Sequence, residues 1–448
     1  MQQIGIAIAG FGTVGQGVYK HLLQNRALLQ QRLGIRFAVH GIAVRNLRRK
    51  RLVKVPRALL TRDWKSLVED PRVSIVVELF GGCNEARRLI LAALRKGKSV
   101  VTANKALLAE HGEEIFEVTA RYRAKIYFEA SVAGGVPIIK ALREGLIVNR
   151  FQMIYGILNG TCNYILSKMS RDGTSFAKAL AAAQRDGYAE ANPALDIDGI
   201  DAGHKVAILA SLSNGFLMPF SKVHIEGIRS ITPLDIRFAR LLGYEIKLLG
   251  IIRAENGIEA RVHPVLIPRS HILAAVDGVY NAIVVRGDVV GDAMFYGRGA
   301  GADATASAVI ADISEAGLDR LYSTEMRPLL GPRGRGAAKI KSIDDVVSRY
   351  YLRLSVVDRP GVLAGIASVL ARAHIGISSV IQPEGHEGKV VPLILMIHDA
   401  KYRDMRRALQ QIVKLPTIRG RPMLVRVESF DVAPFDGGQD LRPGGDVS

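Results

Sequence analysis

The chain has 448 residues, enough for about three domains of the usual ~100–200 residues each. Hydrophobic residues make up 48% of it and charged residues 23%, which predicts packed globular domains and excludes a disordered chain. The net charge of +19 could serve nucleic-acid binding, but without zinc-finger, RRM or KH motifs we expect a solvated basic surface and no nucleic-acid partner.

Short apolar strands alternate with helices over the first part of the chain. No basic segment precedes the first apolar run, so we expect no signal peptide. This alternation is typical of a parallel, doubly wound sheet, and residues 1–130 are predicted to form a Rossmann-type domain. We predict strands at residues 3–9, 35–44 and 73–82, helices at residues 18–33 and 85–97, and strand-then-turn units at residues 98–109 and 124–135.

The segment IAIAGFGTVGQGV carries a Gly-x-Gly-x-x-Gly motif between the first predicted strand and the following helix. Gly10 permits a tight turn, Gly12 lets the backbone approach a pyrophosphate, and Gly15 allows the helix to pack closely on the strand. The helix N-terminus offers N–H groups and a partial positive charge to the phosphates. The motif predicts a dinucleotide site that comprises Gly10, Phe11, Gly12, Thr13, Val14 and Gly15.

The residue after the second predicted strand bears on which dinucleotide binds. An NAD-binding domain usually places Asp or Glu there to hold the ribose hydroxyls, whereas this chain has Arg45. An arginine suits a 2′-phosphate, so we predict NADP as the preferred cofactor and NAD as the alternative. The other reading of Arg45 is that it simply belongs to the exposed basic stretch at residues 45–65.

Residues 131–322 are predicted to form a central α+β domain for catalysis and dimerisation. A second glycine-rich stretch, YGRGAGADATASAV, lies near its end. We expect this stretch to close over the cofactor with Gly301 in contact, and residues near 300–320 to return to the first domain. Within the central domain we predict a helix at residues 174–187 and strands at residues 250–267 and 281–288.

A separate C-terminal unit is predicted after a linker. Residues 323–347 are rich in Pro, Gly and Arg, which is typical of a linker. Residues 348–430 show the order strand, helix, strand, strand, helix, strand. The last residues, 431–448, have few apolar side chains to bury, so we expect a flexible tail.

The stretch ALDIDGIDAGHKVAIL, residues 194–209, is the strongest candidate for catalysis. It places Asp196, Asp198 and Asp201 before Lys205 and an apolar run. Asp201 and Lys205 are four residues apart, so they lie on one face of a helix if one forms. Spacing alone favours a structural ion pair, and the alternative is a reacting centre in which the aspartates hold the substrate.

Several segments together resemble one known family. AGFGTVGQGV, VTANKALLA, EASVAGGVPII, GILNGTCNYIL, the GYAE…VAIL stretch and GRGAGADATASAV occur in the order typical of homoserine dehydrogenase, and VVDRPGVLAGIASVLARAHIGISS resembles an ACT domain. The resemblance implies NAD(P)-dependent, reversible reduction of L-aspartate 4-semialdehyde to L-homoserine in threonine, methionine and isoleucine biosynthesis. It also implies a βαββαβ ACT domain at residues 348–430 that senses an amino acid.

The resemblance also assigns roles to matching positions. Lys205 would donate and accept the proton, and Lys105 would lie beside the nicotinamide and the substrate. The substrate would be bound by Gly187, Glu190, Asp196, Asp201 and Lys105. A monovalent cation, sodium, would be held by Glu129, Val132, Gly134 and Val136.

These roles agree with elementary acid–base chemistry. An amine that is a neutral base in one direction and an ammonium acid in the other can serve both directions of aldehyde reduction. Burial and a second cation, for which Lys105 is the candidate, favour the neutral amine. A pair with Asp201 would oppose that effect, so we expect Asp201 to bind the substrate's amino group or to orient Lys205. Glu129 ends an apolar strand, where it is either a buried carboxylate that needs a cation or donors, or an exposed acid.

The two cysteines argue against a related reductase. Aspartate-semialdehyde dehydrogenase requires a cysteine nucleophile, and neither Cys83 nor Cys162 is expected to serve as one. Cys162 is predicted to be a small core residue, and His204 to be structural.

Two cysteines without CxxC spacing predict a reducing, cytoplasmic location. Glu85 stands where the family commonly has proline, which puts the start of the local helix in question.

The role of the C-terminal unit is left open between two functions. The turn Asp358–Gly361 opens a predicted helix whose N–H groups could meet an amino-acid carboxylate, and the resemblance implies feedback by L-threonine. The alternative is a dimerisation module that binds no ligand. We expect a homodimer or homotetramer. We expect no membrane partner, because no apolar stretch reaches about 18 residues.

Overall fold

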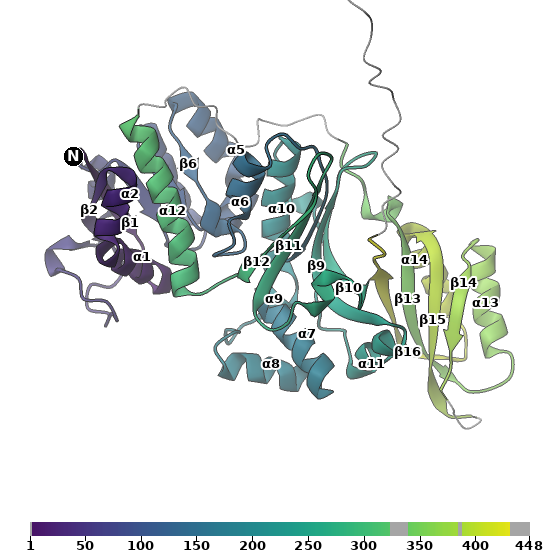
Figure 1. The fold of residues 1–448 in the computed structure, drawn as a ribbon. Helices are drawn as coiled ribbons and strands as arrows, with labels where there is room; N and C mark the ends of the chain where they lie inside the picture. Colours follow the sequence, from purple (N-terminus) through teal and green to yellow (C-terminus); the bar gives the residue numbers. More distant parts are fainter. Residues whose placement is uncertain (1, 323–338, 384–387, 431–448) are drawn as a thin grey trace, which may run out of the picture.

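The computed structural model describes residues 2–322, 339–383 and 388–430, and Figure 1 shows three parts that follow one another from purple to yellow. They are a Rossmann-type domain, a central α+β domain and a C-terminal βαββαβ unit, which confirms the predicted fold class. The predicted tail lies outside the described residues, as does most of the predicted linker. Among the described residues, no helix combines the length and the apolar character needed to cross a membrane.

The first domain is a parallel sheet of six strands in the order β3-β2-β1-β4-β5-β6. This order reverses direction between β1 and β4, and ligands of such sheets bind in the crevice at that point. The strands are β1 (Gln2–Ala9), β2 (Ile35–Ala43), β3 (Leu60–Thr61), β4 (Ile75–Glu78), β5 (Ser99–Thr102) and β6 (Ile126–Tyr127). Helices α3 (Trp64–Glu69), α4 (Asn84–Arg95) and α5 (Lys105–Tyr122) connect them.

The prediction of one helix at residues 18–33 is wrong at two points. Helix α1 (Thr13–Gln24) already begins within the glycine motif, and α2 (Arg26–Leu33) is a separate helix. Asn25 breaks the chain between them with φ −98° and ψ 16°, and its side-chain amide donates to the His21 carbonyl oxygen at 3.2 Å. Apolar periodicity continues across this break, so periodicity alone could not locate it.

Helix α12 (Ala302–Leu321) leaves the central domain and packs on the first one, as its green ribbon among the purple elements shows (Figure 1). Gly17 makes this approach feasible, because a Cβ there would lie 2.9 Å from the carbonyl oxygen of Ala302. His21 and Asp303 join the same two helices, with 2.7 Å between Nε2 and Oδ1. The glycine-rich stretch before α12 is thereby held near the glycine motif of α1.

The central domain and the C-terminal unit share one continuous sheet, which the sequence did not indicate. Its path is β12-β11-β7-β9-β10-β16-β13-β15-β14, with β8 (His224–Ile225) beside β10. The central strands are β7 (Phe151–Ile157), β9 (Tyr244–Arg253), β10 (Glu259–Pro268), β11 (Tyr280–Gly287) and β12 (Gly291–Arg298). The C-terminal elements are β13 (Val347–Val357), α13 (Val362–Arg372), β14 (Ile377–Ile381), β15 (Val390–Lys401), α14 (Tyr402–Ile412) and β16 (Ile418–Val427).

The join between the two parts is a short parallel pair of strands. Residues Val265 and Leu266 of β10 pair with Arg426 and Val427 of β16. A second contact comes from the described end of the predicted linker, where Ile340 forms a bridge with Ile258. The C-terminal unit is therefore attached to the central sheet by backbone hydrogen bonds as well as by the chain itself.

Five helices of the central domain cover its part of the sheet and carry the candidate site. They are α7 (Gly160–Asp172), α8 (Phe176–Arg185), α9 (Ala194–Ile197), α10 (Ile200–Asn214) and α11 (Pro233–Leu241). A short helix, α6 (Ile138–Lys140), lies where the chain enters this domain.

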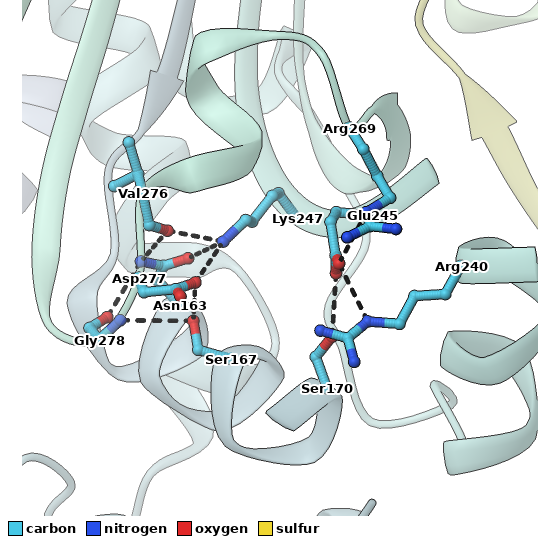
Figure 2. Close-up of polar contacts among 10 residues, drawn as sticks. All are labelled: Asn163, Ser167, Ser170, Arg240, Glu245, Lys247, Arg269, Val276, Asp277 and Gly278. Atoms are coloured by element: carbon cyan, nitrogen blue, oxygen red, sulfur yellow. Dashed lines mark hydrogen bonds and ion pairs between the residues drawn. The ribbon is translucent and has the colours of Figure 1, made fainter. Parts of the chain in front are cut away.

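A buried lysine fixes α7 against the sheet, as Figure 2 shows. Lys247 of β9 donates from Nζ to the carbonyl oxygen of Val276 at 2.6 Å and lies 3.2 Å from an oxygen of Asp277. Asn163 of α7 donates to the carbonyl oxygens of Val276 and Gly278 at 3.1 and 3.0 Å. Burial lowers the pKa of Lys247, opposed by the nearby Asp277. These bonds hold the first half of α7, and with it the residue before the helix, in a fixed position.

Candidate active site

Lys205 lies in α10 with its ammonium group directed at two fixed acceptors. Its Nζ donates to the carbonyl oxygen of Leu158 at 2.6 Å and to Oδ2 of Asp201 at 2.8 Å. The side chain is 10% exposed. A lysine ammonium carries three N–H donors, so these two bonds leave the third available to a ligand. Asp201 and Lys205 are brought together by the four-residue spacing of the helix, as predicted.

Asp201 joins two lysines through one carboxylate. Its Oδ1 lies 3.1 Å from Nζ of Lys105, the first residue of α5, while Oδ2 accepts from Lys205. Burial raises the pKa of Asp201, but the two ammonium groups and the hydrogen bonds outweigh burial and hold the pKa well below its usual range. Both oxygens are thus already occupied. Of the two roles considered for Asp201, the geometry favours orienting Lys205 over binding the substrate's amino group.

Asn159, which the sequence analysis did not single out, completes this group. It precedes α7, and its Oδ1 accepts from the backbone N–H of Cys162 at 2.8 Å. Its Nδ2 donates to Oδ1 of Asp196 at 2.7 Å and to Oδ2 of Asp201 at 2.9 Å. Asparagine before a helix is a preferred N-cap, and this signal in NGTCN could have identified it. One amide therefore fixes the cap of α7 and the positions of two aspartates.

The three aspartates before Lys205 do not act together. Asp196 and Asp201 both accept a hydrogen bond from Asn159. Burial raises the pKa of Asp196, and the charge of Asp201 raises it further, while the hydrogen bond from Asn159 lowers it. Asp198 turns away and forms an ion pair with Arg229, at 2.9 Å between Nη2 and Oδ2. The expectation that all three aspartates hold the substrate is therefore wrong for Asp198, because an arginine from a distant segment takes its carboxylate.

Glu190 and Gly187 lie in an exposed segment that leads toward this group. Gly187 follows the C-cap residue of α8 and has a φ of 76°, a left-handed conformation that suits glycine. The next residue, Tyr188, accepts a hydrogen bond at its carbonyl oxygen from Oγ1 of Thr161 at 2.6 Å. This contact places the segment against the first turn of α7. Among the described residues, the Glu190 carboxylate contacts neither Lys205 nor the aspartates, and its backbone carbonyl accepts from Gln184.

The glycine motif forms a cradle with the features a pyrophosphate requires. Gly10 has a φ of 108°, and a Cβ there would lie 2.4 Å from the carbonyl oxygen of Leu79, at the switch point between β1 and β4. A Cβ on Gly15 would lie 2.1 Å from the carbonyl oxygen of Gly10. Gly12 faces open space and provides no side-chain cap for α1. The N–H groups of Thr13 and Val14 therefore begin α1 without a protein cap.

Arg45 follows β2 by two residues and is exposed. Within the described part of the chain its guanidinium forms no ion pair. Arg51 instead stabilises the loop that follows, with a bond from Nη2 to the carbonyl oxygen of Asn46 at 2.8 Å. Arg45 thus stays available to a ligand beside the end of β2.

The second glycine stretch lies between the lysine and the predicted cation loop. A Cβ on Gly299 would lie 2.0 Å from Oδ1 of Asn281, and one on Gly134 would lie 2.5 Å from the carbonyl oxygen of Gly299. Asn281 donates to the carbonyl oxygen of Leu158 at 3.0 Å, the same oxygen that Lys205 contacts. Gly301, with a φ of 116°, caps α12 and faces open space. Only glycine fits these close approaches.

Glu129 is buried, so the alternative of an exposed acid is wrong. It is 5% exposed, and its two oxygens accept from the backbone N–H groups of Ile139 and Lys140 at 2.9 and 2.8 Å. Burial raises its pKa to about 7 despite these bonds. A second buried carboxyl, Asp312, accepts from the backbone N–H of Glu129 at 2.9 Å. Val132, Gly134 and Val136 are all buried in the loop that follows. The two buried carboxyl groups of Glu129 and Asp312 beside this loop suit the binding of a cation.

Three minor expectations can be compared with the structure. Cys162 is fully buried, and burial raises the pKa of its thiol well above the usual value, which does not suit a nucleophile. His204 contacts Glu110 and Phe220 rather than the Lys205 group. Glu85 does not disturb the helix start, because α4 begins at Asn84 and the Glu85 carboxylate accepts from Trp64 and Arg88 at 3.2 and 2.9 Å.

Family models match all three parts of the chain. Residues 10–129 match the NAD-binding domain of homoserine dehydrogenase, residues 137–314 match homoserine dehydrogenase, and residues 350–417 match the ACT domain.

Individual proteins match over nearly the full length. A homoserine dehydrogenase from Neisseria gonorrhoeae is 42% identical over 434 residues, covering 96% of this chain and 100% of that protein. A homoserine dehydrogenase crystal structure from Thiobacillus denitrificans has a TM-score of 0.89 and 44% identity, covering 95% of this chain and 98% of that one. A hyperthermophilic archaeal homoserine dehydrogenase in complex with NADPH has a TM-score of 0.61 and 28% identity, covering 74% of this chain and 100% of that one.

Proposed function

The chain belongs to the homoserine dehydrogenase family, and from that premise we propose that Lys205 is the residue that exchanges a proton with the substrate oxygen. The family activity is the NAD(P)-dependent interconversion of L-homoserine and L-aspartate 4-semialdehyde. The observation that carries the proposal is the position of the Lys205 ammonium, which uses two of its three donors on Leu158 and Asp201. The remaining donor can be given to a ligand.

In the direction of reduction, the substrate carbonyl carbon receives a hydride, which bound NAD(P) supplies. Lys205 gives a proton to the carbonyl oxygen as negative charge develops there, so the aldehyde becomes an alcohol. The resulting neutral amine keeps two N–H donors for the Leu158 carbonyl and Asp201. In the oxidation of homoserine the amine takes the hydroxyl proton. Asp201 and Leu158 thus hold one nitrogen in place through both protonation states.

The substrate is a zwitterion with a cationic amino group, and carboxylates near Lys205 suit it. We assign Asp196 and Glu190 to that amino group, since Asp201 is occupied by the two lysines. Asp196 has an oxygen beyond the one that Asn159 bonds, and Glu190 lies on the segment at the first turn of α7. Gly187 allows the turn that carries Glu190 there. We assign Lys105 to both substrate and nicotinamide, as the family resemblance implies, and its Nζ lies 3.1 Å from Oδ1 of Asp201.

We infer that NADP is preferred over NAD because Arg45, and no acid, follows β2. In assays of homoserine-dependent reduction of each cofactor, Arg45→Ala should raise the KM for NADP by about 10-fold or more and change the KM for NAD little, since a charged hydrogen bond contributes ~1.5–3 kcal/mol. Arg26→Ala, at an exposed arginine of α2, is the matched control. Equal changes for both cofactors would refute a 2′-phosphate contact.

We propose sodium as the cation at Glu129, Val132, Gly134 and Val136, because it would neutralise a carboxylate buried with only backbone donors. The raised pKa means that the folded chain holds the Glu129 proton more firmly than the unfolded chain. Its contribution to stability is therefore present below the ordinary carboxyl pKa and is lost as pH rises through about 7. The full loss would be about 3 kcal/mol.

Thermal unfolding in sodium-free buffer should therefore occur at lower temperature as pH rises through about 7, and added sodium should reduce this loss. Glu129→Gln should reduce the pH dependence, leaving the part due to Asp312, and should remove the sodium effect. Glu117→Gln, at an exposed position of α5, should keep both. A sodium effect of equal size in Glu129→Gln would place the cation elsewhere.

We further propose that the ACT domain senses L-threonine and acts on Lys205 through the sheet. The strand pair β10–β16 connects the ACT domain to the central sheet, and α10 packs against β10. We also propose that the enzyme acts in threonine, methionine and isoleucine biosynthesis, forms a homodimer or homotetramer and is located in the cytoplasm. These proposals rest on the family and on the composition of the chain.

A further inference from the structure

Three metal-binding side chains converge at a place that the proposed reaction does not use. The sulfur of Cys83, a carboxylate oxygen of Glu110 and a ring nitrogen of His111 all lie within 4.8 Å of one another. Cys83 caps the N-terminus of α4, while Glu110 and His111 are adjacent residues of α5. This group is separate from the Glu129 loop, which offers only oxygen ligands.

The spacing of these atoms fits a zinc-type ion. Sγ of Cys83 lies 3.8 Å from Oε2 of Glu110. Tetrahedral Zn²⁺ with bonds of ~2.3 Å to sulfur and ~2.0 Å to oxygen holds the two atoms ~3.5 Å apart, so only a small adjustment is needed. His111 interrupts α5, with φ −128° and ψ 16° inside an otherwise helical segment. This break is where the imidazole joins the other two ligands.

A second histidine orients the carboxylate. Nε2 of His204 lies 3.2 Å from Oε1 of Glu110, which leaves Oε2 on the side of Cys83. This contact is a hydrogen bond when Nε2 of His204 carries the proton. Metal-bound carboxylates commonly have such a partner. Glu110 is 42% exposed, so water can reach a fourth coordination position.

The electrostatic field at Cys83 also favours a cation. The Glu110 carboxylate lies beside its sulfur, and the negative charge of Glu78 also acts on it.

We propose that Cys83, Glu110 and His111 bind a thiophilic divalent cation of the Zn²⁺ type, with water as the fourth ligand. Binding forms a metal–sulfur bond and releases the thiol proton, so one proton leaves per ion bound and no electron is transferred. The bound ion ties the start of α4 to the middle of α5. Glu110 extends that connection to α10 through His204.

The test uses the purified full-length protein, freed of metal with a chelator and titrated with Co²⁺ alone. Binding of Co²⁺ should release one proton per ion and give a thiolate-to-cobalt charge-transfer absorption. Added Zn²⁺ should displace the Co²⁺ and remove this absorption with no further proton release. Cys83→Ser should abolish the charge-transfer absorption and weaken Zn²⁺ binding about 10-fold or more. Glu110→Gln, at a half-exposed position, should weaken Zn²⁺ binding as well.

Cys162→Ala and His398→Gln are the matched controls, because they remove the other cysteine and a histidine of the ACT domain. Both should bind Co²⁺ as the unaltered chain does, and circular dichroism should show that every variant is folded. Absence of the charge-transfer absorption in the unaltered chain would overturn the proposal. So would unchanged metal binding in folded Cys83→Ser.

Discussion

Replacing Lys205 with methionine should lower kcat by about 10²–10⁴-fold in both directions and leave dinucleotide binding intact. The substitution keeps the length and apolar character of the side chain but removes the ammonium that contacts Leu158 and Asp201. The glycine motif and Arg45 are unchanged, so the cofactor should bind as before. Steady-state kinetics with homoserine and fluorescence titration with NADPH measure the two quantities separately.

Lys178→Met is the matched control, since Lys178 is exposed on α8 and outside the site. It should retain full activity. A Lys205→Met protein that binds NADPH and turns over at the normal rate would show that another group exchanges the proton. Loss of both activity and NADPH binding would instead indicate a structural defect, which circular dichroism would reveal.

Asp201→Asn should lower kcat/KM by about 10²-fold, because it leaves two lysines without the carboxylate they share. The Leu158 carbonyl would remain as a neutral partner of Lys205. Losing the negative charge favours the neutral amine, so the pH at which homoserine oxidation reaches half its maximal rate should fall. A pH profile therefore distinguishes an effect on Lys205 from simple loss of stability.

Asp198→Asn is the control for this prediction. Asp198 lies in the same stretch of sequence, but its carboxylate pairs with Arg229 away from the lysines. The variant should keep both kcat/KM and the pH profile. If Asp201→Asn lowered kcat/KM without moving the pH profile, the carboxylate would not act on the protonation of Lys205.

Local patterns in the sequence were enough to predict much of the fold. Five of the six parallel strands follow from apolar runs that alternate with helices, whereas the two-residue strand β3 was not predicted. The cradle at Gly10–Gly15 follows from the spacing of its glycines. The pairing of Asp201 with Lys205 also follows from spacing, because four residues are one helical turn. In each case the interacting groups lie close together in the chain.

Contacts between distant segments could not be predicted in this way. Lys105 contacts Asp201 because α5 and α10 pack together. Asp198 instead forms an ion pair with Arg229, 31 residues away, and so does not contact the lysines. Asn159 gives a local signal as a helix cap, but its bonds to two aspartates depend on how α7 sits against α10. The pairing of β16 with β10 likewise joins residues more than 150 positions apart and has no signature in either strand.

The central claim is that the free donor of Lys205 reaches the substrate oxygen. A crystal structure with NADP and L-homoserine bound tests it most directly. We expect Nζ of Lys205 at hydrogen-bond distance, ~2.7–3.2 Å, from the homoserine hydroxyl oxygen while it keeps its bonds to Leu158 and Asp201. A hydroxyl bound by other groups, with Lys205 in contact only with Leu158 and Asp201, would contradict the account.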